Sequence, residues 1–332
     1  GRKITIICLV LVIVPTLVLG YVAYTSAESA IQDSILTTLS IQTADMEEAT
    51  RSAYEFTLVK VKSDLKVLHE HLYEKGKPEI VNGNLYFGSS YKINNNFEIV
   101  DKIQGMIGGT ATVFQKVGDQ AIRISTNVID EDGQRAIGTS LSPDIYDKVI
   151  NKGQTHYGTA TVVGKRYITA YEPVKNPANE IIGVIYVGVE EDATIGALRE
   201  QIMNKKIGKN GYVFVLDSDG LALIHPTREG QNDSNLPFIR TIITNKKGHL
   251  YYNWDDKDKI AVFSYFEPFD WIIVANADYH NFTDPIDNIR NTIILVVILG
   301  IVGGLFVASL FGRTISRRMG ELVTLARQVR DG

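Results

Sequence analysis

The chain of 332 residues has a single cysteine, Cys8, and no excess of basic over acidic residues. One cysteine excludes a fold held together by internal disulfide bonds, so its domains must be stabilised by packing. The 34 Lys and Arg residues are balanced by 38 Asp and Glu residues, and the two signs are interspersed. This balance excludes the basic surface that nucleic-acid binding requires, so we expect no nucleic-acid partner.

The sequence also lacks the motifs of common enzymes. It has no Gly-rich phosphate loop, and no Ser or Cys nucleophile motif accompanies its histidines. DSDG at 217–220 and DEDG at 130–133 resemble the start of a calcium loop, but neither has the later bidentate glutamate at the right spacing. His69 and His71 are two residues apart and do not share a helix face. We therefore expect no enzyme activity, no metal site and no cofactor.

Two stretches, 4–24 and 292–312, contain no charged residue. Each is long enough to cross a hydrocarbon core of about 30 Å, so we predict two transmembrane helices. A signal peptide is the alternative for the first stretch, but no small-residue cleavage pattern follows it. Basic residues precede the first stretch and follow the second. The positive-inside rule then predicts a multi-pass protein of the cell (inner or plasma) membrane, with about 25–291 extracellular or periplasmic.

Residues 26–74 contain neither proline nor glycine, which is typical of a long helix. Apolar residues recur there at helical intervals, at Ile31, Ile35, Leu39, Met46, Ala49, Ala53, Phe56, Leu65, Leu68 and Leu72. We predict a stalk helix over 26–75 that continues the first membrane helix. Its apolar stripe is wide enough to pack against a sheet and against the same helix of a second copy, in a homodimer.

After Pro78 the pattern changes to short β-type segments separated by turn signals. Two strands, a helical patch at 142–153 and three strands fill 78–190, and a connecting helix is expected at 191–206. The same order then returns in 207–280, with the DSDG turn matched to the DEDG turn. YEP at 171–173 and FEP at 266–268 are each interpreted as the turn into a last buried strand. The predicted fold class is α+β, with tandem PAS-like modules on the long N-terminal helix between the two transmembrane helices.

These residues resemble the Cache family of extracellular sensor domains. GGTATVFQ, RISTNV and GKRYITAYEPVKN look like the Cache_3 type, and IGKNGYVFVLDSDGLALIHP looks like the Cache_2 type. Their order resembles the Cache_3–Cache_2 fusion found mostly in methyl-accepting chemotaxis receptors. Residues 313–332 resemble the start of a HAMP domain, although the proline usual near the position of Arg318 is absent. A coiled-coil seam is predicted at Met319, Leu322, Ala326 and Val329.

The resemblance implies a transmembrane chemoreceptor that senses an extracellular small molecule and signals through HAMP to cytoplasmic signalling proteins in chemotaxis. The alternatives are the sensor region of a histidine kinase or diguanylate cyclase, and a structural ectodomain without a ligand. Because the sequence begins at Gly1 and stops after VRDG, we expect it to be part of a longer protein.

Strand alternation groups the polar and aromatic residues of the first module into a possible binding surface. It places Tyr167, Thr169 and Tyr171 on one face, and it groups Arg123 with Ser125 and Asn127. Tyrosines around a threonine favour a partly buried wall, and nearby cations favour an anionic or zwitterionic ligand. The alternative is an ordinary solvated sheet face. With the resemblance to Cache pocket strands, the predicted ligand-binding residues are Arg123, Ser125, Thr126, Asn127, Lys165, Tyr167, Thr169 and Tyr171.

The second module leads directly into the second apolar stretch, so we expect it to lie nearer the membrane than the first. The resemblance implies that the distal module takes the ligand and the proximal one transmits the signal. In the second module the candidate residues are Tyr252, His225 and Arg228.

Overall fold

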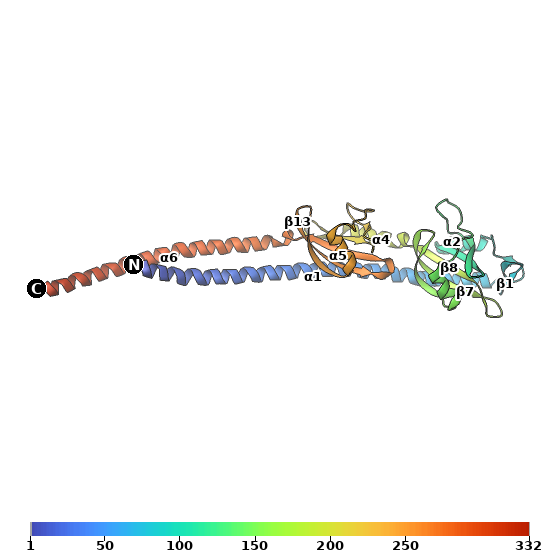
Figure 1. The fold of residues 1–332 in the computed structure, drawn as a ribbon, viewed down its shortest axis with the longest axis horizontal. Helices are drawn as coiled ribbons and strands as arrows, with labels where there is room; N and C mark the ends of the chain where they lie inside the picture. The colour runs from blue at the N-terminus through green and yellow to red at the C-terminus, as the bar shows by residue number, and fades with distance from the viewer. Residues whose placement is uncertain (1, 332) are drawn as a thin grey trace.

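The computed structural model describes the backbone of residues 2–331. It describes their side chains except at 2–9, 12, 281, 283–287, 308, 311–313, 315–319 and 321–331. The molecule is a long rod (Figure 1). Helix α1 (Arg2–Tyr73) runs along both modules, and α6 (His280–Asp331) lies beside the first part of α1 and extends beyond it. The predicted stalk is therefore part of one continuous helix of 72 residues.

The buried stripe of α1 contains threonines as well as apolar residues. Thr43, Thr50 and Thr57 are spaced by seven residues and are at most 6% exposed. Two of their hydroxyls donate to carbonyls four residues earlier, so burial leaves no hydroxyl unpaired there. Phe56, which was predicted to belong to the stripe, is instead 77% exposed. Thr57 rather than Phe56 faces the modules, and Phe56 lies on the part of the stripe that is predicted to pack against a second copy.

The first module (78–190) contains two antiparallel sheets. A small sheet of order β1–β2–β3 lies at the far end of the rod, and a five-stranded sheet has the order β5–β4–β8–β7–β6. The strands are β1 (Pro78–Val81), β2 (Asn84–Phe87), β3 (Tyr91–Lys92), β4 (Thr110–Val117), β5 (Gln120–Thr126), β6 (His156–Val162), β7 (Lys165–Lys175) and β8 (Ile181–Glu190). Its helical elements are α2 (Glu98–Ile107), α3 (Pro143–Tyr146) and the π-helical turn η1 (Asp147–Asn151).

The second module (207–280) repeats this plan and is joined to the first by α4 (Glu191–Asn204). Its sheet has the order β11–β10–β14–β13–β12, with β9 beside β10. The elements are β9 (Lys206–Ile207), β10 (Gly211–Leu216), β11 (Ala222–Ile224), α5 (Pro237–Asn245), β12 (Gly248–Trp254), β13 (Lys257–Phe266), the 3-10 turn η2 (Glu267–Phe269) and β14 (Trp271–Asp278). Both modules thus have the predicted α+β, PAS-like order of strands.

Three details differ from the sequence predictions. The DSDG turn joins β10 to β11 and so corresponds to the turn between β4 and β5, whereas DEDG follows β5. The repeat was therefore matched one strand too late. The YEP segment lies inside β7 rather than in a turn, while FEP does overlap η2. Helix α2 was not predicted, although Ile99, Val100 and Ile103 give it a buried face.

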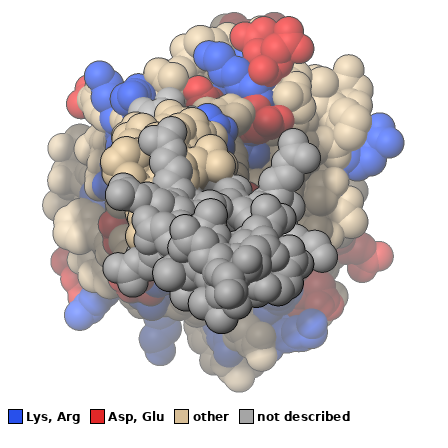
Figure 2. Space-filling view, turned by 90° about the vertical axis from the view of Figure 1, so that its left-hand side faces the viewer, with Lys and Arg blue, Asp and Glu red and all other residues tan. Residues whose placement is uncertain are grey.

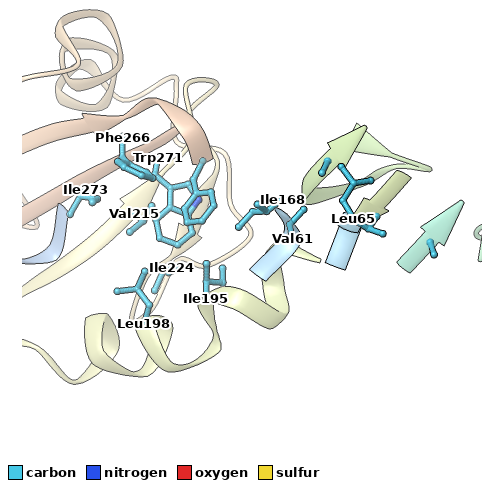
Figure 3. Close-up of a cluster of buried hydrophobic side chains, with 14 of the residues drawn as sticks. Val61, Leu65, Ile168, Ile195, Leu198, Val215, Ile224, Phe266, Trp271 and Ile273 are labelled. Carbon is cyan, nitrogen blue, oxygen red and sulfur yellow. The ribbon is translucent and has the colours of Figure 1, made fainter. Parts of the chain in front are cut away.

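Each main sheet is packed on both faces. One face lies against α1, where buried side chains form a core that continues from one module to the other. Figure 3 shows part of it, with Ile168 of the first module and Val61 of α1 beside Trp271 and Ile195. The opposite faces carry separate cores, under α3 and η1 in the first module and under α5 in the second. These opposite faces are where binding sites can form.

Within the described side chains, one stretch is long and apolar enough to cross a membrane, Asn288–Val307 in α6. It overlaps the predicted span at 292–312. The predicted first span includes residues 4–9 and 12, and the HAMP seam includes Met319 to Val329, whose side chains lie outside the described ones. Gly20 permits the close approach of the two helices, because a Cβ there would lie 2.7 Å from Ile293. Seen from this end, acidic and basic side chains are mixed around the modules (Figure 2).

Candidate ligand-binding site

The candidate site lies on the face of the five-stranded sheet that points away from α1. The loop 127–142 and the segment α3–η1 cover this face. The space between the sheet and this cover is filled by a buried core, whose members include Phe114, Val128, Leu141, Ile145, Val149, Tyr167, Tyr171 and Tyr186. A ligand that enters here must displace part of the cover.

Arg123 is a buried cation at the centre of this face. It is 6% exposed, and its Nη1 donates to Thr139 Oγ1 at 2.6 Å and to the Ala136 carbonyl at 3.4 Å. Its guanidinium lies 5.1 Å from the centre of the Phe114 ring, and its Nε has no hydrogen-bond partner. Burial lowers the pKa of Arg123 below its ordinary value. Among the described side chains no carboxylate pairs with it, so the site holds an uncompensated positive charge.

Three tyrosines surround the guanidinium. Tyr171 and Tyr186 are cross-strand neighbours with ring centres 4.9 Å apart, and Tyr167 lies on the same face of β7. Burial raises the pKa of all three hydroxyls, so they stay protonated. Tyr186 shares a hydrogen bond with Thr110 at 3.0 Å. The hydroxyls of Tyr167 and Tyr171 have no hydrogen bond within the described chain, and they are donors that a carboxylate could use.

The cover of the site contributes a negative charge. Asp144 on α3 is close enough to influence the pKa values of both Tyr171 and His156. It also lines a recess of about 290 Å³ with Ser142, Thr159 and Arg166. Arg123 and Asp144 thus both act on Tyr171, the first from within the core and the second from the cover.

A β-bulge separates residues that were predicted to share a face. Val113 pairs with Ser125 and the next residue, Phe114, pairs with Arg123, so Ile124 is the extra residue. Ser125 consequently points to the other face and donates to the Asn96 carbonyl at 2.6 Å. Asn127 donates to the Val100 carbonyl at 2.8 Å. The predicted grouping of Arg123 with Ser125 and Asn127 is wrong for this reason.

The remaining predicted residues divide between the site and the surface. Thr126 faces the site side of the sheet, but its hydroxyl is bonded to Thr112 at 2.6 Å. Thr169 lies between the two tyrosines of β7 and donates to the Gly158 carbonyl at 2.8 Å. Lys165 lies outside the site, because its side chain is 64% exposed and pairs with Glu190 at 2.6 Å. Arg123, Tyr167 and Tyr171 are therefore the predicted residues that the fold brings together.

Tyr186 is the main site residue that the sequence reasoning missed. It is the one aromatic side chain within the apolar run IIGVIYVGV, and it is fully buried. The signal available in the sequence was Gly188, two residues later on the same face. A Cβ at Gly188 would lie 2.2 Å from the Tyr186 hydroxyl, so this glycine makes room for the ring.

The second module has a pocket of about 20 Å³ on its equivalent face. Its lining includes the three predicted candidates, Tyr252, His225 and Arg228. Among the described residues there is no group of three or more His, Cys, Asp or Glu side chains that could hold a metal ion.

A family model described as the Cache 3/Cache 2 fusion domain matches residues 24–292. The chain belongs to this family. The match covers both modules of the Cache 3/Cache 2 fusion domain and the part of α1 that packs against them.

The curated relatives of this Cache 3/Cache 2 fusion domain include chemotaxis proteins of Bacillus subtilis (strain 168). The methyl-accepting chemotaxis protein McpB is 24% identical over 144 residues, which are 43% of this chain and 22% of McpB. TlpB is 22% identical over 188 residues, which are 55% of this chain and 27% of TlpB. The chain spans about a quarter of the length of these relatives.

Similar solved structures include two sensory domains. The ligand-binding domain of the Campylobacter jejuni chemoreceptor Tlp3 in complex with L-valine is 16% identical, with a TM-score of 0.45 over 77% of this chain and 97% of that one. The ligand-binding domain of Mlp24 with asparagine is 15% identical, with a TM-score of 0.43 over 80% and 98% of the two chains.

Proposed function

We propose that this chain is the sensory and membrane portion of a chemoreceptor whose first module binds an extracellular anionic or zwitterionic small molecule. The observation that carries the proposal is Arg123, a buried cation without a carboxylate partner in the described chain, beside two tyrosine hydroxyls without partners. A ligand carboxylate would compensate this charge and accept from the hydroxyls. The names of the curated relatives support chemotaxis as the output.

The ligand would bind with its carboxylate toward Arg123. If it also carries an ammonium group, that group would lie toward Asp144, at the cover of the site. Because the site is closed without a ligand, binding would select or stabilise a conformation in which the loop 127–142 or α3 has moved. The cover is therefore the element that reports occupancy.

A set of contacts joins this site to the end of the second module. Arg166 follows Lys165 and precedes Tyr167 on β7, and it crosses to the second module. Its Nε donates to Glu191 Oε2 at 3.0 Å, and its Nη2 donates to the Pro268 carbonyl at 3.2 Å. Pro268 lies in η2, directly before β14, and β14 leads to α6. A displacement of β7 would thus reach α6, with an expected shift of about 1–2 Å.

The membrane arrangement belongs to the proposal as well. Two spans, at 4–24 and in α6, would place both ends in the cytoplasm, and the helix after the second span would open a HAMP domain. Cytoplasmic signalling proteins would read the shift of α6 through that domain. At the junction, Gln32 of α1 donates to the Tyr279 hydroxyl at 3.0 Å, which couples the incoming and outgoing helices.

A homodimer would form along the stalk of α1. On the side away from the modules, α1 exposes Ile41, Phe56 and Val59, which are 52%, 77% and 66% exposed. A second copy of the helix would cover these side chains, and its packing would change when α6 shifts.

The proposal is tested by measuring the thermal stability of the purified full chain with a panel of organic acids, amino acids and amines. A ligand of the folded state raises the unfolding temperature in a concentration-dependent way. We expect at least one carboxylate compound to do so, and we expect Arg123→Ala or Tyr171→Ala to remove the effect. Absence of stabilisation across all the carboxylates would contradict direct sensing.

A further inference from the structure

The second module has an internal pocket at the position of the first-module site. The strand pairing is equivalent in the two modules. Phe114 of β4 and Phe214 of β10 each pair with the fourth residue of the last strand of their module. Arg123 pairs opposite Phe114. His225 follows Ile224, which pairs with the residue after Phe214, so the histidine continues the ladder opposite Phe214. Its ring centre lies 5.1 Å from that of Phe214, just as the Arg123 guanidinium lies 5.1 Å from the Phe114 ring.

The side chain in this equivalent position is an uncharged donor instead of a cation. His225 is 7% exposed, and its Nδ1 accepts from the backbone N–H groups of Thr227 and Arg228, both at 3.1 Å. The ring proton must therefore lie on Nε2. Burial lowers the pKa of His225 to about 4, so the ring is neutral at physiological pH. Nε2 is 3.5 Å from the Tyr212 hydroxyl, which leaves this donor weakly engaged.

Aromatic rings form the wall opposite His225. Phe238 stacks on Tyr252 with ring centres 4.4 Å apart, and it meets Trp254 edge-on at 5.4 Å. The one cation among the lining residues, Arg228, is neutralised by Asp233, with Nε and Oδ2 2.8 Å apart. The cavity left among these groups is about 20 Å³, roughly the space of one water molecule.

We infer that this pocket is a second ligand site, selective for small uncharged aromatic compounds that carry a hydroxyl group. The hydroxyl oxygen would accept from His225 Nε2, and the ring would enter the aromatic wall by displacing Tyr252 or Trp254, which are only partly buried. A carboxylate is disfavoured because no free cation among the lining residues would compensate it. This inference does not depend on ligand binding at Arg123.

The test uses the full chain in lipid nanodiscs, labelled with 5-fluorotryptophan. The sequence has two tryptophans, so fluorine NMR gives one resonance for Trp254 in the pocket wall and one for Trp271 in the core against α1. The resonance that disappears in the Trp254→Phe variant is assigned to Trp254, and the remaining one to Trp271. The probes are benzyl alcohol and benzoate, which share a ring and differ in charge. We expect benzyl alcohol to shift the Trp254 resonance saturably without moving that of Trp271, and we expect benzoate to leave both unchanged.

Variants of His225 separate specific binding from simple partitioning. His225→Leu should weaken benzyl alcohol binding at least tenfold, because the donor is lost. His225→Arg, which reproduces the charge of the first module, should make benzoate the better probe. Arg123→Met should leave the Trp254 response unchanged, which keeps this result distinct from the first-module site. The inference is overturned if benzyl alcohol gives no saturable Trp254 shift, if both resonances move together, or if His225→Leu binds as the wild type does.

Discussion

At the scale of single residues, Arg123 and Arg135 form a natural comparison within the first module. Arg135 pairs with Asp101 through two hydrogen bonds of 2.7 and 2.9 Å and also donates to the Thr126 carbonyl. Arg123 is more deeply buried and has only Thr139 and a carbonyl. Arg135 has a carboxylate partner and Arg123 has none among the described side chains, and this difference supports the proposal that Arg123 binds a ligand.

Replacing Arg123 should therefore stabilise the unliganded chain. Arg123→Met keeps much of the side-chain volume and removes an unpaired buried charge. We expect the free energy of unfolding to rise by about 1 kcal/mol or more, because the desolvation cost disappears. Arg135→Met is the matched control and should lower it, since Asp101 loses its partner. Thermal unfolding of both variants without ligand is the measurement. An Arg123→Met variant as unstable as Arg135→Met would make Arg123 a structural residue.

His225 gives a prediction about pH. Its folded-state pKa of about 4 lies below the ordinary value of 6.5, because burial outweighs the carboxylates of Asp233 and Glu229, while Arg228 adds to the lowering. As the pH falls, the unfolded chain takes up the proton first. The stability that depends on the neutral ring is fully present above pH 6.5 and is lost as the pH falls toward 4, by up to about 3 kcal/mol. Denaturant unfolding of the wild type and His225→Asn at several pH values measures this. A difference between them that stays constant from pH 7 to pH 4 would contradict it.

At the scale of elements, the register between strands determines which side chains reach the site. The pairing of β4 with β8 is especially close at Gly183, where an added Cβ would lie 2.4 Å from the Phe114 carbonyl oxygen. Phe114 is the residue that supports Arg123. The close packing of the β4 and β8 backbones therefore helps to position Phe114 and Arg123.

Gly183→Ala should separate β4 from β8 and lower the free energy of unfolding by about 2–3 kcal/mol. Gly196→Ala in α4 is the matched control, because no atom lies within 4 Å of its Cβ position. It should raise the free energy of unfolding by about 0.5–1 kcal/mol, since alanine favours the helix. Equal effects of the two substitutions in denaturant titrations would show that the close contact of Gly183 with Phe114 does not determine the free energy of unfolding.

The same scale explains what could be predicted from the sequence. The strand order of the modules and the stalk helix follow from alternating and helical patterns, and the tyrosines of β7 are correctly placed by simple alternation. Ser125 and Asn127 were misplaced because a bulge at Ile124 shifts the alternation, and a bulge depends on the partner strand. The buried threonines of α1 were missed because the stripe was traced through apolar residues alone. Both features depend on contacts between elements that are distant in the sequence, and a local sequence pattern does not contain this information.

At the scale of the whole molecule, the rod connects the first module to the membrane end by two routes. One is α1 itself, and the other passes through Arg166, Pro268 and β14 to α6. A signal can shift α6 relative to α1 only if α1 is held in place by something outside the chain. In the proposed homodimer, the second copy of the stalk supplies that reference.

The dimer is tested by placing a charge on the exposed side of α1. Phe56→Asp should weaken self-association at least tenfold, because Phe56 would be buried between the two stalks. Val117→Asp is the matched control, since Val117 is also exposed, at 55%, but is the last residue of β4 and lies away from α1. Sedimentation of the full chain in detergent measures both. Unchanged association in Phe56→Asp would exclude this face of α1 as the interface.

The most direct test of the central claim is a calorimetric titration of the full chain with a carboxylate ligand found in the stability screen. The wild type is compared with Arg123→Met and with Lys165→Met, whose lysine lies on the surface. We predict that Arg123→Met weakens binding by about 30-fold or more, which corresponds to about 2 kcal/mol for a charged hydrogen-bonded contact, while Lys165→Met stays within about twofold of the wild type. Equal affinities of the wild type and Arg123→Met would contradict the account.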